Sequence, residues 1–249
     1  MLKLNKFTEN YERVFMRAPK VLAKREPQVH DLSLSSYDRQ QATFVVASKY
    51  IELGYLHYWL ENFNEVKPNL KKAAPYAFLR GFDDELKTHN NDWTIQEDLN
   101  MCLLFGNDST TNKLIDLTTN FKTSSIINQA CYLYDHLLLQ IGTGQTLIQA
   151  DIDAAINQAK NTKDKDVLQY ILPLIEAINA LVSNDKTLWQ TSINKAIAWH
   201  ADECKFGDYK EMAEGFMCLN ALTMAKLGKT MRGWICETDS LYLPLFLID

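Results

Sequence analysis

The sequence is poor in the residues that turn or interrupt a chain. Only 9 glycines and 6 prolines occur among its 249 residues, too few for a protein built from many hairpins and tight turns. Leu, Ala, Lys, Asn and Gln are frequent instead, and they favour helices joined by short polar loops. We therefore expect an all-α fold, either a multi-helix bundle or a short solenoid of helical hairpins.

Long hydrophobic runs and clusters of basic residues are also missing. No stretch approaches the roughly 18 apolar residues of a membrane span, and the opening MLKLNKFTENYERVF lacks the apolar stretch of a signal peptide. The formal net charge of −5 disfavours binding to nucleic acid, because that affinity rests on neutralising phosphates. These features predict a cytoplasmic protein without membrane or nucleic-acid partners, better suited to a basic protein partner.

The cysteines are few and scattered. There are five of them, an odd number, and none is spaced C-x-x-C. This pattern predicts free, buried thiols in a reducing compartment. The five positions are Cys102, Cys131, Cys204, Cys218 and Cys236.

Recognisable catalytic and cofactor motifs are absent. There is no G-x-S-x-G, and Gly142–Gly144 lacks the rest of a dinucleotide or phosphate loop. His200 and Cys204 could share a helix face and bind zinc, but they also continue an apolar stripe that begins at Trp189, so we expect core packing. The sequence predicts neither an enzyme nor a cofactor. A hydrolase whose site assembles in space near His57 or His200 remains an alternative.

Hydrophobic spacing predicts a series of helices in the first part of the chain. Pro19 should interrupt the first helix, and Pro68 and Pro75 should bound a loop. Ser35 and Asp38 resemble a capping box, and Thr94 with Glu97 forms a clearer one. The expected helices cover residues 7–25, about 28 residues from Ser35, 75–87, 94–106, 110–121, 125–140 and 151–161.

The charged loop NTKDKD divides this part from the rest. We expect a single helical domain over 1–249, with 1–161 and 162–249 as its two possible halves. In the second half, Pro173 should kink one helix and Asn184 or Asp185 should cap the next. A last helix over 210–227 should end at Gly228 as an αL cap, followed by an extended C-terminal arm.

The second half resembles a known family. Its segments VLQYILPLIEAINALV, NDKTLWQTSINKAIAWHADECK and EGFMCLNALTMAKLGKTMRGWICETDSLYLPLFLI are similar, in this order, to bacterial immunity proteins of polymorphic toxin systems. The closest match is the helical family numbered forty-nine. The resemblance covers about 165–249, and the first 160 residues match only in being helical. The matching positions are Asp185, Trp189, Ile193, Ala196, Ile197, His200, Leu219 to Leu227, Gly228, Tyr242, Leu243, Pro244 and Leu247.

This resemblance implies a binding module that neutralises a toxin delivered between competing bacteria, for instance by type VI secretion. It would occupy the toxin's active site or a surface needed for activity, and it would need no catalysis. A cytoplasm-acting nuclease, or a toxin that targets nucleotides or nucleic acids, fits best. Acidic helix ends and loops could mimic a phosphate backbone, with Tyr209, Trp93 and Tyr37 as aromatic anchors. The candidate partner-binding residues are Asp83, Asp84, Glu85, Asp202, Glu203, Asp208, Tyr209, Glu211 and Glu214.

Two questions stay open at this point. The rival to a toxin inhibitor is a helical scaffold or adaptor that binds a peptide or protein in a groove between helices. The second question concerns the tail, DSLYLPLFLID, which is unusually apolar. We expect it to return across the final helices and seal the edge of the core, with Pro244 preventing a helix, rather than to insert into a partner.

Overall fold

The computed structural model describes residues 1–5, 7 and 10–249. Its described part is all-α, as the sequence predicts, with ten α-helices and no strand; Asn91 and Ser125 form one isolated parallel bridge. One π-helical turn, η1, and two short 3₁₀ segments, η2 and η3, complete the elements. Their bounds are α1 Tyr11–Val29, α2 Ser36–Trp59, α3 Phe63–Phe82, α4 Gln96–Phe105, α5 Asp108–Leu117, α6 Gln129–Gly142, α7 Gln149–Lys160, η1 Val167–Ile171, α8 Leu172–Ser183, α9 Lys186–Phe206, η2 Ala213–Phe216, α10 Leu219–Arg232 and η3 Leu245–Leu247.

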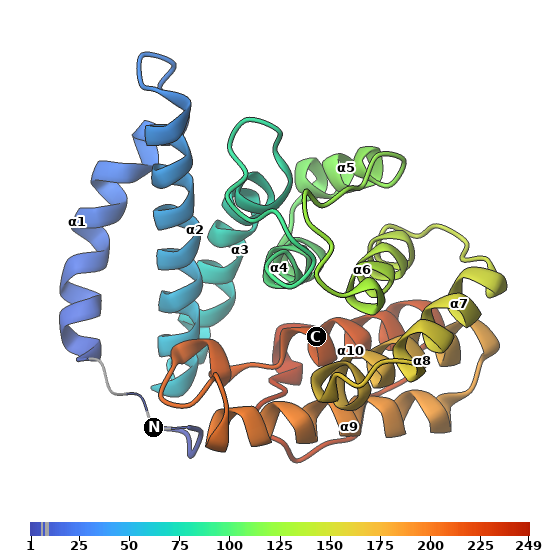
Figure 1. Ribbon diagram of the computed structural model, residues 1–249. Helices are drawn as coiled ribbons and strands as arrows, with labels where there is room; N and C mark the ends of the chain where they lie inside the picture. Colours follow the sequence, from blue (N-terminus) through green and yellow to red (C-terminus); the bar gives the residue numbers. More distant parts are fainter. Residues whose placement is uncertain (6, 8–9) are drawn as a thin grey trace.

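The helices form two groups that meet at an angle. Helices α1, α2 and α3 stand side by side, whereas α8, α9 and α10 extend sideways from the lower end of this group (Figure 1). Helix α4 packs against both α3 and α10 and so joins the groups. The loop between α9 and α10, which contains η2, reaches back to α2. A contiguous hydrophobic cluster runs from Ala18 on α1 to Leu247 in the tail.

The expected breaks at proline are wrong for the N-terminal helices. Helix α1 continues through Pro19 and Pro27, and α3 contains Pro68 and Pro75. A proline removes one helical hydrogen bond and costs roughly 3 kcal/mol in a helix interior. Both helices nevertheless persist because each buries an apolar face against α2, and tertiary packing supplies most helical stability in proteins.

Capping was predicted well at some helix starts and wrongly at another. Ser35 caps α2 and Asp185 caps α9, each accepting a hydrogen bond from the backbone N–H three residues on. The capping box at Thr94 is wrong, because α4 begins at Gln96 and the Thr94 hydroxyl instead donates to the Asn91 carbonyl, at 3.1 Å. Asn91 and Thr94 therefore close a separate turn that precedes α4.

The ends of the last helices also differ from expectation. Pro173 falls in the first turn of α8, directly after the π-helical η1, where its missing N–H removes no bond from the interior of α8. Helix α10 begins only at Leu219, so most of the expected 210–218 stretch is loop and 3₁₀ turn. Gly228 lies inside α10, and the αL cap is Gly233, with φ of 69°.

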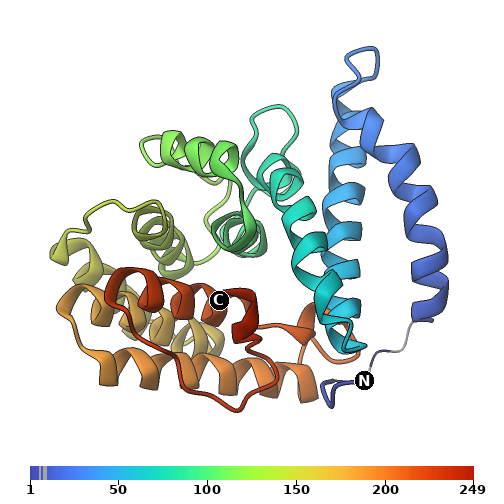
Figure 2. The ribbon, with the colours of Figure 1, turned by 180° about the vertical axis from the view of Figure 1, so that it is seen from behind.

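The C-terminal tail seals the core, as expected. It runs back along α10 to the foot of α2 and α3 (Figure 2). Leu243 and Leu247 are buried, the Tyr58 hydroxyl donates to the Leu241 carbonyl at 2.5 Å, and Phe246 lies edge-to-face on Phe63 at 5.2 Å. The apolar residues of the tail thus link α10 to the N-terminal helices.

Candidate functional site

A polar cleft lies where the two groups of helices meet, between α2 and α4 on one side and η1, α9, η2 and α10 on the other. Its volume is about 240 Å³. Aromatic rings, carboxylates and side-chain amides line it together. The lining includes Tyr55, Trp93, Gln96, Glu97, Asn100, Tyr170, Trp199, Tyr209, Glu214 and Asn220.

Aromatic rings form the wall on the side of α9. Tyr170 and Trp199 stack nearly parallel, with ring centroids 4.1 Å apart. The Trp199 indole N–H donates to the Asp166 carboxylate at 3.2 Å, which fixes the ring. Tyr209 stands edge-on to Trp199 at 6.4 Å, and the half-buried Trp93 completes the lining from the loop before α4. Flat, partly exposed rings of this kind suit stacking with a planar group.

Carboxylates from α4 and η2 also line the cleft. The Tyr55 hydroxyl donates to Glu97 at 3.3 Å. Burial raises the pKa of Tyr55 well above its usual value, and the negative charges of Glu97 and Glu214 raise it further, so both carboxylates act on this hydroxyl. A second hollow of about 210 Å³ shares Tyr55, Glu97 and Glu214 and extends the acidic lining to Glu52. The two hollows form one acidic region.

A buried ion-pair network positions Glu97. The Arg80 guanidinium, 2% exposed, donates to Glu97 at 2.7 Å and to Asp98 at 2.5 and 2.9 Å. Burial alone would lower the pKa of Arg80, but Asp98 and Glu97 outweigh it and raise the pKa. The His89 ring lies 3.1 Å from Asp98. Asp98 and Glu97 together therefore neutralise the buried Arg80 guanidinium, while 30% of the Glu97 side chain remains exposed.

Side-chain amides form the floor of the cleft. Asn100 Nδ2 donates to the Gln96 carbonyl at 2.7 Å and to Asn220 Oδ1 at 2.6 Å. Asn220 Nδ2 in turn donates to the Tyr170 hydroxyl at 2.9 Å, and its Oδ1 accepts from the Tyr134 hydroxyl at 2.8 Å. These bonds fix both amides between α4 and α10.

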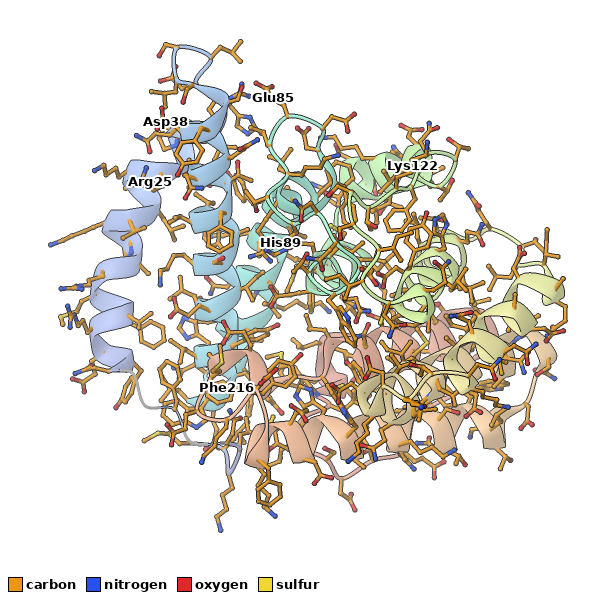
Figure 3. The ribbon with its side chains drawn as sticks, viewed as in Figure 1. Arg25, Asp38, Glu85, His89, Lys122 and Phe216 are labelled. Carbon is orange, nitrogen blue, oxygen red and sulfur yellow. The ribbon has the colours of Figure 1, made fainter. Side chains whose placement is uncertain are left out.

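The loop that carries Tyr209 and Glu214 is held on both faces. Asn5 Nδ2 donates to the carbonyls of Tyr209 and Met212, at 2.9 and 2.7 Å. Phe216 stacks on Trp59 at the foot of α2, with centroids 5.6 Å apart (Figure 3). The loop is therefore anchored to both the N-terminal segment and α2, which fixes the lip of the cleft.

His200 and Cys204 pack in the core, as expected. Both lie against the Gly215 carbonyl, at 2.9 Å from His200 Nε2 and 3.1 Å from Cys204 Sγ. Burial lowers the pKa of His200 to about 4 and raises that of Cys204 to about 12. Among the described residues, no group of three or more His, Cys, Asp or Glu is placed to hold a metal ion.

The structure does not bring the predicted partner-binding residues together. Asp83, Asp84 and Glu85 follow α3. Glu85 lies near the start of α2, where it accepts from the Ser36 hydroxyl at 3.2 Å (Figure 3). Asp83 caps its own turn by accepting from the Glu85 and Leu86 N–H groups, and Glu85 binds Arg39 at 2.6 Å. Asp84 is fully exposed beside Lys87.

The remaining candidates divide between the cleft and the surface around it. Tyr209 and Glu214 line the cleft. Asp202 lines a separate hollow of about 400 Å³ between η1, α8 and α9. The other three candidates are Glu203, in the last turn of α9, and Asp208 and Glu211, in the loop that follows. Glu203 accepts a hydrogen bond from the Asp208 N–H at 3.0 Å, and Glu211 adopts a left-handed φ of 65°.

Most of the cleft does not follow from the sequence. Glu97 fits a capping box there, and Asn100 is not among the predicted site residues. A usable signal was the run Gln96-Glu97-Asp98, followed by Asn100, within a helix that is otherwise apolar. Polar residues so dense in a short, central helix predict either a buried network or a site, and here they form both.

Comparison with known proteins places these features in a family. The family model of immunity protein 49 matches residues 91–247. The chain belongs to the immunity protein 49 family. The match begins well before the expected limit near 165 and so includes α4 to α6. Of these helices, α4 packs on α10 and α6 packs on α8. All cleft residues named above except Tyr55 lie within it. Searches of curated proteins and of solved structures gave no match.

Membership of this family supports a role as an immunity protein that acts by binding a toxin. The described part of the chain contains no helix long and apolar enough to cross a membrane.

We expect His200 to make the protein sensitive to acid. Its folded-state pKa of about 4 lies below the usual 6.5, so the unfolded state binds a proton first as the pH falls. The stability is complete above pH 6.5 and is lost between pH 6.5 and 4, by up to about 3 kcal/mol. Urea unfolding at pH 7, 5.5 and 4.5 should therefore show a flatter pH dependence for His200→Gln than for the wild type.

The control is His30→Gln, because His30 is exposed at the end of α1. This variant should keep the pH dependence of the wild type. Parallel losses of stability in His200→Gln and the wild type would contradict the assignment.

Proposed function

We propose that this protein binds and neutralises a cognate toxin that acts in the cytoplasm, and that it does so without catalysis. A basic toxin that targets nucleic acid or nucleotides is the best candidate. The observation that carries the proposal is the acidic, aromatic cleft, which lies almost entirely within the residues matched by the immunity family. Its negative charge complements the basic surface expected of a protein that binds phosphates.

The cleft also indicates how the toxin would be blocked. A nuclease or nucleotide-processing toxin needs cationic side chains in its active site to bind phosphate. An acidic partner that engages those side chains removes them from the substrate. The loop that carries Tyr209 and Glu214 is anchored by Asn5 and Phe216, so the lip of the cleft is already ordered and should cost little entropy on binding.

Co-expression with the toxin domain encoded beside its gene tests the proposal. We expect the two proteins to co-purify with nanomolar affinity, and growth of cells that express the toxin in the cytoplasm to be restored. Binding without restored growth would instead favour the scaffold or adaptor function. Absence of binding to the neighbouring toxin would refute the proposed function.

A further inference from the structure

The cleft has the chemistry of a receptor for a planar cation. Carboxylates lie in and directly beneath it, together with aromatic rings. Nearby negative charge and flat π faces both favour a positively charged group over a neutral one. The carboxylates are Glu52, Glu97, Asp98 and Glu214. Arg80 pairs with Glu97 and Asp98, and Lys49 pairs with Glu52.

A buried acceptor without a partner points to a ligand independently of these charges. Asn100 is 1% exposed, and its Oδ1 has no hydrogen-bond partner within the described structure. Its orientation is fixed, because Nδ2 donates to the Gln96 carbonyl, which can only accept. Leaving such an atom unpaired costs about 1–3 kcal/mol, so a donor that enters the cleft would satisfy a group that folding leaves unsatisfied.

We propose that the cleft receives the guanidinium group of an arginine side chain from the cognate toxin. Glu97 and Glu214 bind its N–H groups, the Trp93, Trp199 and Tyr209 rings border its plane, and Asn100 Oδ1 lies in the floor as a further acceptor. This inference rests on the proposed function and specifies the chemistry of its interface.

Two features favour arginine over other cations or a free ligand. A guanidinium is planar, carries five donors and stacks on aromatic rings, whereas a lysine ammonium is a compact, strongly hydrated point charge. The cleft volume of about 240 Å³ lies below the roughly 300–1,000 Å³ of sites that enclose a small molecule. A single large side chain therefore suits the space better than a whole cofactor.

Affinity for the toxin domain tests the inference from the immunity side. Removing one partner of a desolvated charge pair weakens binding by at least about 30-fold. We therefore expect a loss of that size for the Glu97→Gln/Glu214→Gln variant in isothermal titration calorimetry. Glu12→Gln is the matched control, because Glu12 is exposed on α1, and it should bind as the wild type does.

A second variant separates binding from folding, because Glu97→Gln also weakens the ion pair with Arg80. Glu214→Lys leaves Arg80 and its partners intact and places a cation at the exposed lip. It should weaken binding at least as much as the double variant, and far-ultraviolet circular dichroism should show that it keeps the helical fold. Wild-type affinity for Glu214→Lys, in a protein that still restores growth, would refute the cleft inference and leave the immunity function standing. Failure of the wild type itself to bind would refute the proposed function.

Substitutions on the toxin identify the inserted group. Each arginine and lysine of the toxin domain is replaced by alanine and combined with Glu214→Gln in a double-mutant cycle. One arginine should account for the effect, so that Glu214→Gln no longer weakens binding once that arginine is alanine. Arg→Lys at this position should recover only part of the affinity. Coupling to a lysine, or to no single residue, would overturn the assignment.

Discussion

Replacement of Asp98 by alanine is expected to lower the free energy of unfolding by about 3–5 kcal/mol, measured by urea denaturation. Asp98 is fully buried and accepts three hydrogen bonds from Arg80, which is itself buried. Removing it leaves a desolvated guanidinium whose remaining hydrogen-bond partners, among the residues that the structure describes, are Glu97 and the Ser48 hydroxyl. A buried charge that loses part of its compensation is the most expensive consequence of breaking such a network.

The control is Glu85→Gln, which breaks the ion pair with Arg39. Glu85 is 52% exposed in that pair, so the loss should stay within about 1 kcal/mol. The double variant Asp98→Ala/Arg80→Met should recover much of the stability of Asp98→Ala, because it removes the stranded charge. Equal costs for Asp98→Ala and Glu85→Gln, or no recovery in the double variant, would contradict this account.

The same network connects the core to the cleft. Arg80 holds Glu97 from beneath while Glu97 remains partly exposed, so the stability of α3 and α4 and the geometry of the acidic lining depend on one guanidinium. Asp98→Ala should consequently also weaken toxin binding. A structural network of this kind can keep a partly exposed carboxylate in a fixed position before the partner arrives.

Periodicity predicted the helical class and the buried stripe of α9, because burial of an apolar face dominates helix formation in proteins. Trp189, Ile193 and Cys204 are all buried there. The same physics explains the errors at Pro19 and Pro75, where local propensity opposed tertiary packing and packing decided the outcome. The Thr94 capping box failed for a different reason, because the Thr94 hydroxyl found a competing partner in the Asn91 carbonyl.

The cleft was less accessible to sequence reasoning than the fold. Its lining comes from residues as distant in the chain as Tyr55 and Asn220, and only the packing of α10 on α4 brings them together. Charge in the sequence marked exposed groups such as Asp84 as readily as cleft groups such as Glu214. Both side chains are exposed, and only the tertiary fold places Glu214 in the lining of the cleft.

Removing the Trp189 side chain should lower the free energy of unfolding by as much as removing that of Asp98. It is fully buried, and its indole N–H donates to the Met224 carbonyl of α10 at 3.1 Å. Trp189→Ala should destabilise the protein by about 3–5 kcal/mol, because it leaves a large cavity between α9 and α10. Urea unfolding monitored by circular dichroism measures this loss. Leu188→Ala, at a partly buried position one residue earlier, is the control and should cost clearly less.

Substitution of Gly228 tests whether α10 needs a glycine at this position because the Trp189 indole approaches it so closely. A Cβ atom at Gly228 would lie 2.2 Å from Trp189 Cζ2, so Gly228→Ala should destabilise the wild type by about 1–3 kcal/mol through overpacking. In the Trp189→Ala background the clash is gone, and alanine should stabilise α10 by up to about 1 kcal/mol, its helix-propensity advantage over glycine. The sign of the Gly228→Ala effect should therefore reverse between the two backgrounds. The same sign in both would mean that Gly228 is required for the backbone of α10 and not for its contact with α9.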